Sequence, residues 1–140
     1  MVRVSNLEIL KILRENSRIP TIKIAKMLGV SETAVRKRIK RMEREGIIRR
    51  YTIEIDPKKI GFKVNTLIGL DTRPENYIQT LEKLKEMEEV VSLYTSTGDH
   101  MLLIECWLKD SEELTKLVKK LGAIEGVTKI CPAILLEKIK

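Results

Sequence analysis

The sequence of 140 residues predicts an α+β fold in two parts, a helical part and then a part with elements in the order βαββαβ. Up to Gly46 the apolar residues recur every three or four positions, as in amphipathic helices, and beyond it alternating runs typical of strands appear. The charge divides near the same place. Residues 1–50 carry 14 Lys or Arg and 5 Asp or Glu, a net charge of +9, whereas residues 51–140 carry 13 and 15, a net charge of −2. We therefore expect domains over residues 1–50 and 63–140, with a linking strand and hinge over residues 51–62.

The composition excludes several classes of protein. With 43% apolar residues, the chain is too hydrophobic for a disordered protein, and no apolar run is long enough to span a membrane. Its first residues lead directly into a helical pattern, which argues against a secretory leader. The two cysteines, Cys106 and Cys131, are too few for a disulfide framework. We expect a cytoplasmic protein without a membrane partner.

Helices are expected throughout the first part. The first begins at Ser5 or Asn6, and the second begins after Pro20 and ends at Gly29. Ser31 caps the third, which runs to about residue 45. The apolar residues of this third helix form one narrow stripe: Val35, Ile39 and Met42.

The second part has strand patterns over residues 63–71, 90–97, 101–108 and 127–136. Pro74 begins a helix after the first strand, and Asp110 caps another before the last. The order predicts a ferredoxin-like arrangement, with both helices on one face of an antiparallel sheet. In the link, the alternation from Tyr51 to Ile55 predicts an additional strand. The inward residues expected on the helix after Pro74 are Tyr77, Ile78, Leu81 and Leu84.

The first part has the outline of a helix-turn-helix: a short helix, a tight turn with Gly29 and Ser31, and a strongly basic helix. Such a helix packs by one stripe and leaves its other sides free to enter the major groove of duplex DNA. Short side chains allow a close approach to base edges, and long basic ones reach phosphates. The expected DNA-binding residues are Thr33, Ala34 and Lys37 at base edges, Arg36, Arg38, Lys40, Arg41 and Arg44 mainly at phosphates, and Ser31 at the start of the helix.

Two alternatives account for a basic helix in other ways. A solvated helix without a partner would relieve its repulsion by acidic neighbours, but residues 36–50 hold eight basic residues, and the helix has only Glu32, Glu43 and Glu45 to balance them. A binder of single-stranded nucleic acid needs aromatic residues beside the basic ones, and the basic helix has none. Duplex DNA is the favoured partner.

Specific motifs run through the whole chain. They are the turn Gly29-Val30-Ser31, Val35 with Arg38-Ile39, Met42-Glu43 through Gly46-Ile47-Ile48, Asp56-Pro57 with Gly61, and Thr97-Gly98-Asp99-His100. In this order and spacing, they resemble the Lrp/AsnC (feast/famine) family of transcription regulators. The second half is similar to the amino-acid-sensing βαββαβ domain of that family.

The resemblance implies a sequence-specific, DNA-binding transcription regulator that forms dimers and, from these, octamers. It also implies a small effector, usually an amino acid, between dimers near the glycine turn. By position, the effector-binding residues are Gly98, Asp99, His100, Ile124 and Glu125. A carboxylate and the N–H groups of a glycine turn suit the ammonium and carboxylate of an amino acid. The sequence departs from the family in its last strand, where Ile130-Cys131-Pro132-Ala133 replaces a stretch that frequently carries threonine.

An enzyme is the main alternative function. Haem-precursor decarboxylases that act on tetrapyrroles reuse a similar fold and depend on histidines, whereas this chain has only His100 and no Ser-His or Cys-His arrangement. Cys106 and Cys131 have no clustered partners and are better explained as structural thiols than as metal ligands. We therefore expect no enzyme activity, no catalytic residue, no metal and no cofactor other than the effector.

Overall fold

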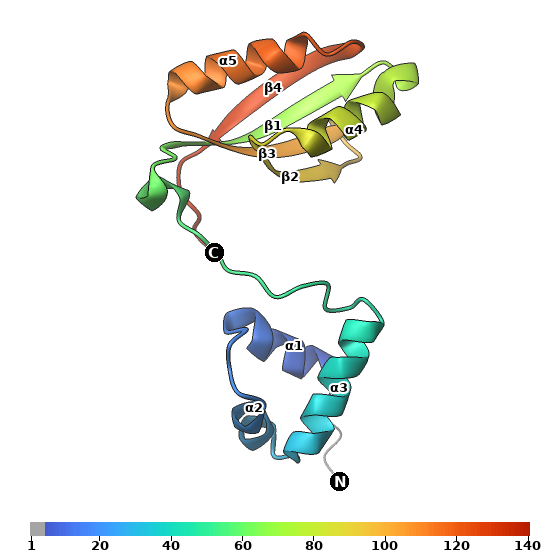
Figure 1. The fold of residues 1–140 in the computed structure, drawn as a ribbon, viewed down its shortest axis with the longest axis vertical. Helices are drawn as coiled ribbons and strands as arrows, with labels where there is room; N and C mark the ends of the chain where they lie inside the picture. The colour runs from blue at the N-terminus through green and yellow to red at the C-terminus, as the bar shows by residue number, and fades with distance from the viewer. Residues whose placement is uncertain (1–4) are drawn as a thin grey trace. The chain divides into compact units, whose positions relative to one another are not determined.

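The computed structural model describes residues 5–140, and the chain forms two compact units that divide after Glu54 (Figure 1). Each unit has its own cluster of buried apolar side chains. The first unit is helical, and the second is a mixed unit of the βαββαβ type. The two-part α+β fold expected from the sequence is therefore confirmed.

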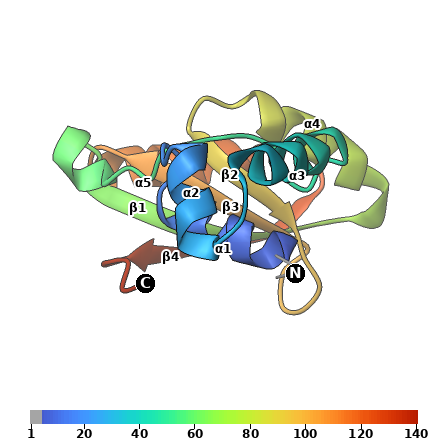
Figure 2. The same ribbon diagram turned by 90° about the horizontal axis from the view of Figure 1, so that it is seen from below.

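The first unit consists of α1 (Asn6–Glu15), α2 (Thr21–Leu28) and α3 (Glu32–Arg44), seen from another side in Figure 2. The expected caps are present. The Ser5 hydroxyl accepts the Glu8 N–H at 3.3 Å, while the Glu8 carboxylate accepts the Ser5 N–H at 2.9 Å. Gly29, with φ of 67°, ends α2, and the Ser31 hydroxyl accepts a backbone N–H of α3. The buried apolar residues are Ile9, Ile24, Ala25, Val35, Ile39 and Met42.

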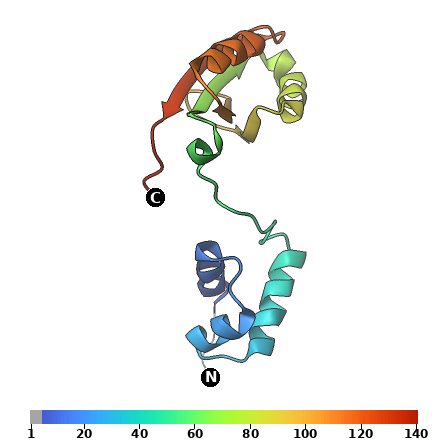
Figure 3. The same ribbon diagram turned by 60° about the vertical axis from the view of Figure 1, so that its left-hand side comes forward.

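In the second unit, an antiparallel sheet has the strand order β2-β3-β1-β4. Its elements, in chain order, are β1 (Val64–Thr72), α4 (Tyr77–Glu86), β2 (Val90–Thr95), β3 (Leu102–Leu108), α5 (Ser111–Gly122) and β4 (Val127–Leu135). Both helices cover the same face of the sheet (Figures 1 and 3). As expected, Asp110 caps α5 by accepting the Glu113 N–H at 2.8 Å. This is the ferredoxin-like arrangement that the element order predicts.

The register determines which residues face the helices. Ile68 pairs with Ile104 and Leu70 with Leu102, and all four side chains are buried under α4 and α5. Because successive side chains of a strand alternate, the neighbours of these residues point to the other side. We call this other side of the sheet the open face, and its apolar residues include Leu67, Tyr94, Leu103, Trp107 and Leu135.

One local expectation is wrong, and another stays a prediction. Residues 51–55 form no strand within a single chain, where Ile53 is 74% exposed. The alternation is present, but a strand also needs a hydrogen-bonded neighbour. On α4, Ile78 is 67% exposed, because the sheet-facing stripe passes through Tyr77, Leu81 and Leu84. Pro74 begins a short 3-10 turn (Pro74–Asn76) just before α4.

None of the helices within residues 5–140 has the length and apolar character needed to cross a bilayer.

Candidate nucleic-acid interface and effector site

The outer side of α3 is the first candidate site. Val35, Ile39 and Met42 are buried, and at 100° per residue the opposite side of the helix carries Thr33, Lys37, Lys40 and Arg44. All four of these side chains are exposed. The structure thus arranges one polar and three basic residues in a line along the side of α3 that does not pack against its own unit.

A second group of residues ties the start of α3 to α2. The Glu32 carboxylate accepts hydrogen bonds from the Thr21 hydroxyl at 2.9 Å and from Nη2 of Arg36 at 2.6 Å. These two partners, Thr21 first, lower the pKa of Glu32. Arg36 also donates to the Thr21 hydroxyl at 3.4 Å. The charge of Arg36 is therefore partly balanced within the unit. The spacing of four between Glu32 and Arg36 is the sequence signal for this pair, but nothing in the sequence indicated Thr21.

The remaining expected DNA-binding residues lie in different environments. Nη1 of Arg38 donates to the side chain of Asn6 at 3.0 Å, so Arg38 is half-buried against α1. Arg41 forms an ion pair with Glu45 at 2.8 Å. Ala34 is half-buried near the turn, and Ser31 is exposed while its hydroxyl caps α3.

The turn between β2 and β3 contains Gly98, Asp99 and His100. Gly98 has a φ of 109°, a conformation that favours glycine, and Asp99 is exposed. Nδ1 of His100 lies 2.9 Å from one oxygen of Asp71, on β1, and the N–H of Met101 donates to the other oxygen at 2.9 Å. The hydrogen bond with His100, and next the one from Met101, lower the pKa of Asp71. Sequence reasoning missed Asp71, which lies 29 residues before its partner.

Ile124 and Glu125 lie in the connection between α5 and β4. Thr72, the last residue of β1, pairs with Val127, and Leu70 pairs with Leu102, so this connection and the β2–β3 turn lie at the same end of the sheet. Their side chains are nevertheless not gathered in one place. Ile124 packs against the core under the helices, whereas His100 covers Gly69 on the open face.

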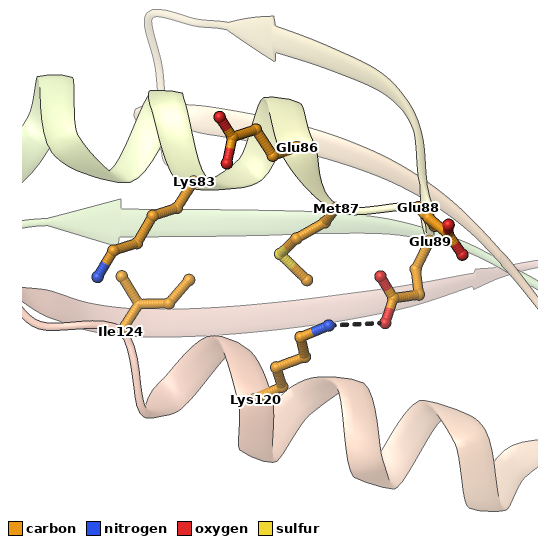
Figure 4. A pocket seen from close by; sticks show the side chains of 7 residues that line it. All are labelled: Lys83, Glu86, Met87, Glu88, Glu89, Lys120 and Ile124. Atoms are coloured by element: carbon orange, nitrogen blue, oxygen red, sulfur yellow. Dashed lines mark hydrogen bonds and ion pairs between the residues drawn. The ribbon is translucent and has the colours of Figure 1, made fainter.

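A groove with a volume of about 580 Å³ lies between α4 and α5 (Figure 4). Met87 and Ile124 are its half-buried apolar side chains, and a 3.0 Å ion pair between Lys120 and Glu89 crosses one end. The groove includes Ile124 from the expected effector-binding residues, but not the β2–β3 turn. The residues that line it are Lys83, Glu86, Met87, Glu88, Glu89, Lys120 and Ile124.

Comparison with known families accounts for both units. Residues 4–49 match the winged helix-turn-helix DNA-binding family, and residues 65–140 match the Lrp/AsnC ligand binding domain. The chain belongs to the Lrp/AsnC family. Among its Lrp/AsnC relatives, the HTH-type transcriptional regulator LrpA of Pyrococcus abyssi is 54% identical over 133 residues, which are 94% of each chain.

Solved structures of transcription regulators have the same fold. AsnC of Escherichia coli is 28% identical, with a TM-score of 0.82 over 99% of this chain and 96% of that one. The complex of the regulator NMB0573 of Neisseria meningitidis with L-Met is 22% identical, with a TM-score of 0.88 over 100% and 93%. This Lrp/AsnC chain is thus a DNA-binding transcription regulator with a ligand-binding domain. The comparisons give the tetrapyrrole decarboxylase alternative no support, and residues 5–140 contain no cluster of side chains suited to a metal ion.

Proposed function

We propose that this Lrp/AsnC regulator binds specific duplex DNA sequences as a dimer and responds to an amino acid. The observation that carries the proposal is the outer line of α3, Thr33, Lys37, Lys40 and Arg44. Within the described part of the chain, no acidic side chain forms an ion pair with Lys37, Lys40 or Arg44 at 4.0 Å or less, whereas Arg36 and Arg41 have such partners. A polyanion is the partner that such a line fits.

The roles of the α3 residues follow from their positions. Thr33 and Ala34, near the start of the helix, and Lys37, one turn later, face base edges. Lys40 and Arg44 reach phosphates farther along. Arg36 and Arg41, which flank this line, and Arg38, on the side toward α1, also contact phosphates. Ser31 contacts the DNA at the start of the helix.

Dimerisation is proposed because one recognition helix reads only one half-site. Two features support it. The open face exposes Tyr94 and Leu135 and also carries the half-buried Trp107, so a second copy would cover apolar surface there. The alternating segment of residues 51–55 exposes Tyr51 and Ile53, and pairing with the same segment of a second copy would form the linking strand. Dimers then associate further into octamers.

The effector is proposed to be an amino acid bound near the β2–β3 turn by Gly98, Asp99 and His100, with Ile124 and Glu125 contributing from the connection between α5 and β4 at the same end of the sheet. The exposed Asp99 carboxylate suits an ammonium group, and the backbone N–H groups of the turn suit a carboxylate. The L-Met complex of the Neisseria regulator supports this class of ligand. No cofactor is needed for this function, and the protein works in the cytoplasm without a membrane.

Selection of binding sites from random duplex DNA tests the DNA part of the proposal. The selected sequences should be pseudo-palindromic, with half-sites separated by about one helical turn or a multiple of it. Light scattering of the same protein at micromolar concentration should give at least a dimer. A monomer, or a selected pool without a consensus, would contradict the proposal.

A thermal-shift screen of the amino acids tests the effector part. At least one amino acid should raise the melting temperature of the wild-type protein, because a ligand that binds only the folded state stabilises it. The same ligand should not shift the melting temperature of Asp99→Ala, while Asp56→Ala, which removes a carboxylate near the link, should respond like the wild type. If no amino acid has an effect, the sensing proposal fails.

A further inference from the structure

His100 is held on the open face by two residues of β1. Its ring lies over Gly69, and its Nδ1 is 2.9 Å from the carboxylate of Asp71. The side chains of His100 and Asp71 are only 18% and 19% exposed, so this is a partly buried pair rather than a solvated turn contact. The position of the imidazole is therefore defined by the sheet and not only by the turn that carries it.

Gly69 is required for this arrangement. Any Cβ at position 69 would overlap the His100 ring, whose Cδ2, Cγ and Nε2 atoms all lie over the glycine. Because Ile68 and Leu70 point toward the helices, Gly69 faces the open side, where its missing side chain leaves room for the imidazole. Gly69 and the ring thus form one packing unit at this end of the sheet.

Asp71 determines which nitrogen of His100 carries the proton. An ionised carboxylate only accepts hydrogen bonds, so the neutral imidazole must place its hydrogen on Nδ1. The second oxygen of Asp71 accepts the Met101 N–H, which prevents the carboxylate from turning away, and Lys129 lies next to Asp71 in the β1–β4 register. Nε2 is then left without a proton. No donor within the described residues forms a hydrogen bond with it.

We propose that Asp71 and Gly69 are positioning residues that make His100 Nε2 an acceptor for the ammonium group of the amino-acid effector. The inference rests on the proposed function, in which the effector binds at this turn. An ammonium group has three N–H donors, and Nε2 supplies one acceptor while the adjacent Asp99 carboxylate supplies another. In this role Asp71 does not touch the effector. It acts by fixing the tautomer and orientation of His100.

The protonation state can be read directly, because His100 is the only histidine in the sequence. Nitrogen-15 NMR of the imidazole in the full-length protein, at a pH where the ring is neutral, should show the hydrogen on Nδ1. Addition of an amino acid that binds in calorimetry should shift the Nε2 resonance. In Asp71→Asn the side-chain amide can donate to Nδ1, so the hydrogen should move to Nε2. That change replaces the acceptor by a donor, and the effector affinity should fall about tenfold or more.

Two further variants separate positioning from simple stability. Glu105→Gln removes a carboxylate from the same face without contacting His100, and it should leave the tautomer and the effector affinity unchanged. Gly69→Ala should displace the His100 ring and lower the effector affinity about as much as Asp71→Asn does, even though Gly69→Ala removes no polar group. If Asp71→Asn does not fold, the wild-type spectrum and Gly69→Ala decide the question.

Several results would overturn the inference. One is a wild-type ring with its hydrogen on Nε2. Another is a bound amino acid that leaves the Nε2 resonance unchanged, or that binds Asp71→Asn and Gly69→Ala as tightly as the wild type. If no amino acid binds the wild type, the proposed function fails, and the proposed contact between Nε2 and the effector fails with it. The tautomer measured without ligand then shows separately whether Asp71 holds the hydrogen of His100 on Nδ1.

Discussion

Replacing Lys40 and Arg44 together by alanine tests whether the outer side of α3 contacts the DNA backbone. Both side chains are exposed and lie opposite the buried stripe, and neither forms an ion pair with an acidic side chain within residues 5–140. Each phosphate contact contributes about 0.9 to the slope of log K against log salt concentration. The double variant should therefore lower that slope by about 1.8 for each bound protomer, and by about 3.6 for a dimer on two half-sites.

Fluorescence anisotropy with a labelled duplex, repeated over a series of salt concentrations, measures the slope. Arg38→Ala is the comparison variant. It removes one charge from the same helix, where the double variant removes two, and its guanidinium donates to Asn6 across the unit. As a single phosphate contact, Arg38 should contribute about 0.9 to the slope for each bound protomer, half the effect of the double variant, and Arg38→Ala should also lower the free energy of unfolding by about 1–2 kcal/mol. If Arg38→Ala reduces the slope as much as the double variant does, the assignment of faces is wrong.

Three other predictions concern stability and reactivity. Burial raises the pKa of the Cys106 thiol to about 12, so a thiol reagent at about pH 8 should leave Cys106 unmodified in the folded protein. Two modified thiols per native chain would refute this. Gly126 has a φ of 87°, and a Cβ there would overlap a neighbouring side chain, so Gly126→Ala should lower the unfolding free energy in urea by about 1–3 kcal/mol. An unchanged urea midpoint would argue against that packing. The hydrogen bond with His100 holds the pKa of Asp71 below its ordinary value of 3.8. Ionised Asp71 therefore contributes fully to the free energy of unfolding above pH 3.8, and this contribution is lost as the pH falls through the lowered pKa of the folded state. Unfolding free energies measured from about pH 5 to 2 should therefore fall more steeply in the wild type than in Asp71→Asn, and parallel curves would contradict this.

Local chemistry made much of the fold predictable. Ser5 and Ser31 cap helices because a hydroxyl at those positions satisfies backbone N–H groups, and this requirement can be seen in the sequence itself. The same holds for Asp110 and for the glycine that ends α2. The strand expected over residues 51–55 is not formed by one chain alone, because alternation cannot supply a neighbouring strand.

The candidate sites were harder to predict, because long-range contacts assign their side chains. Arg38 resembles the other basic residues of α3 in the sequence, and only its contact with Asn6 distinguishes it. His100 was expected as an effector residue, but neither its partner Asp71 nor the glycine beneath its ring lies near it in the sequence. Strand pairing brings these residues together, and alternation along one strand indicates which side of the sheet a residue faces but not which strand lies beside it.

The separate cores of the two units have a consequence for cells that contain both intact and damaged chains. A substitution that unfolds the core around Ile9, Ile24 and Met42 removes none of the buried residues that hold the sheet together. Such a chain would keep the open face through which we propose that protomers pair. Mixed dimers would then have one working recognition helix instead of two, so a single defective allele should act dominantly over the normal one.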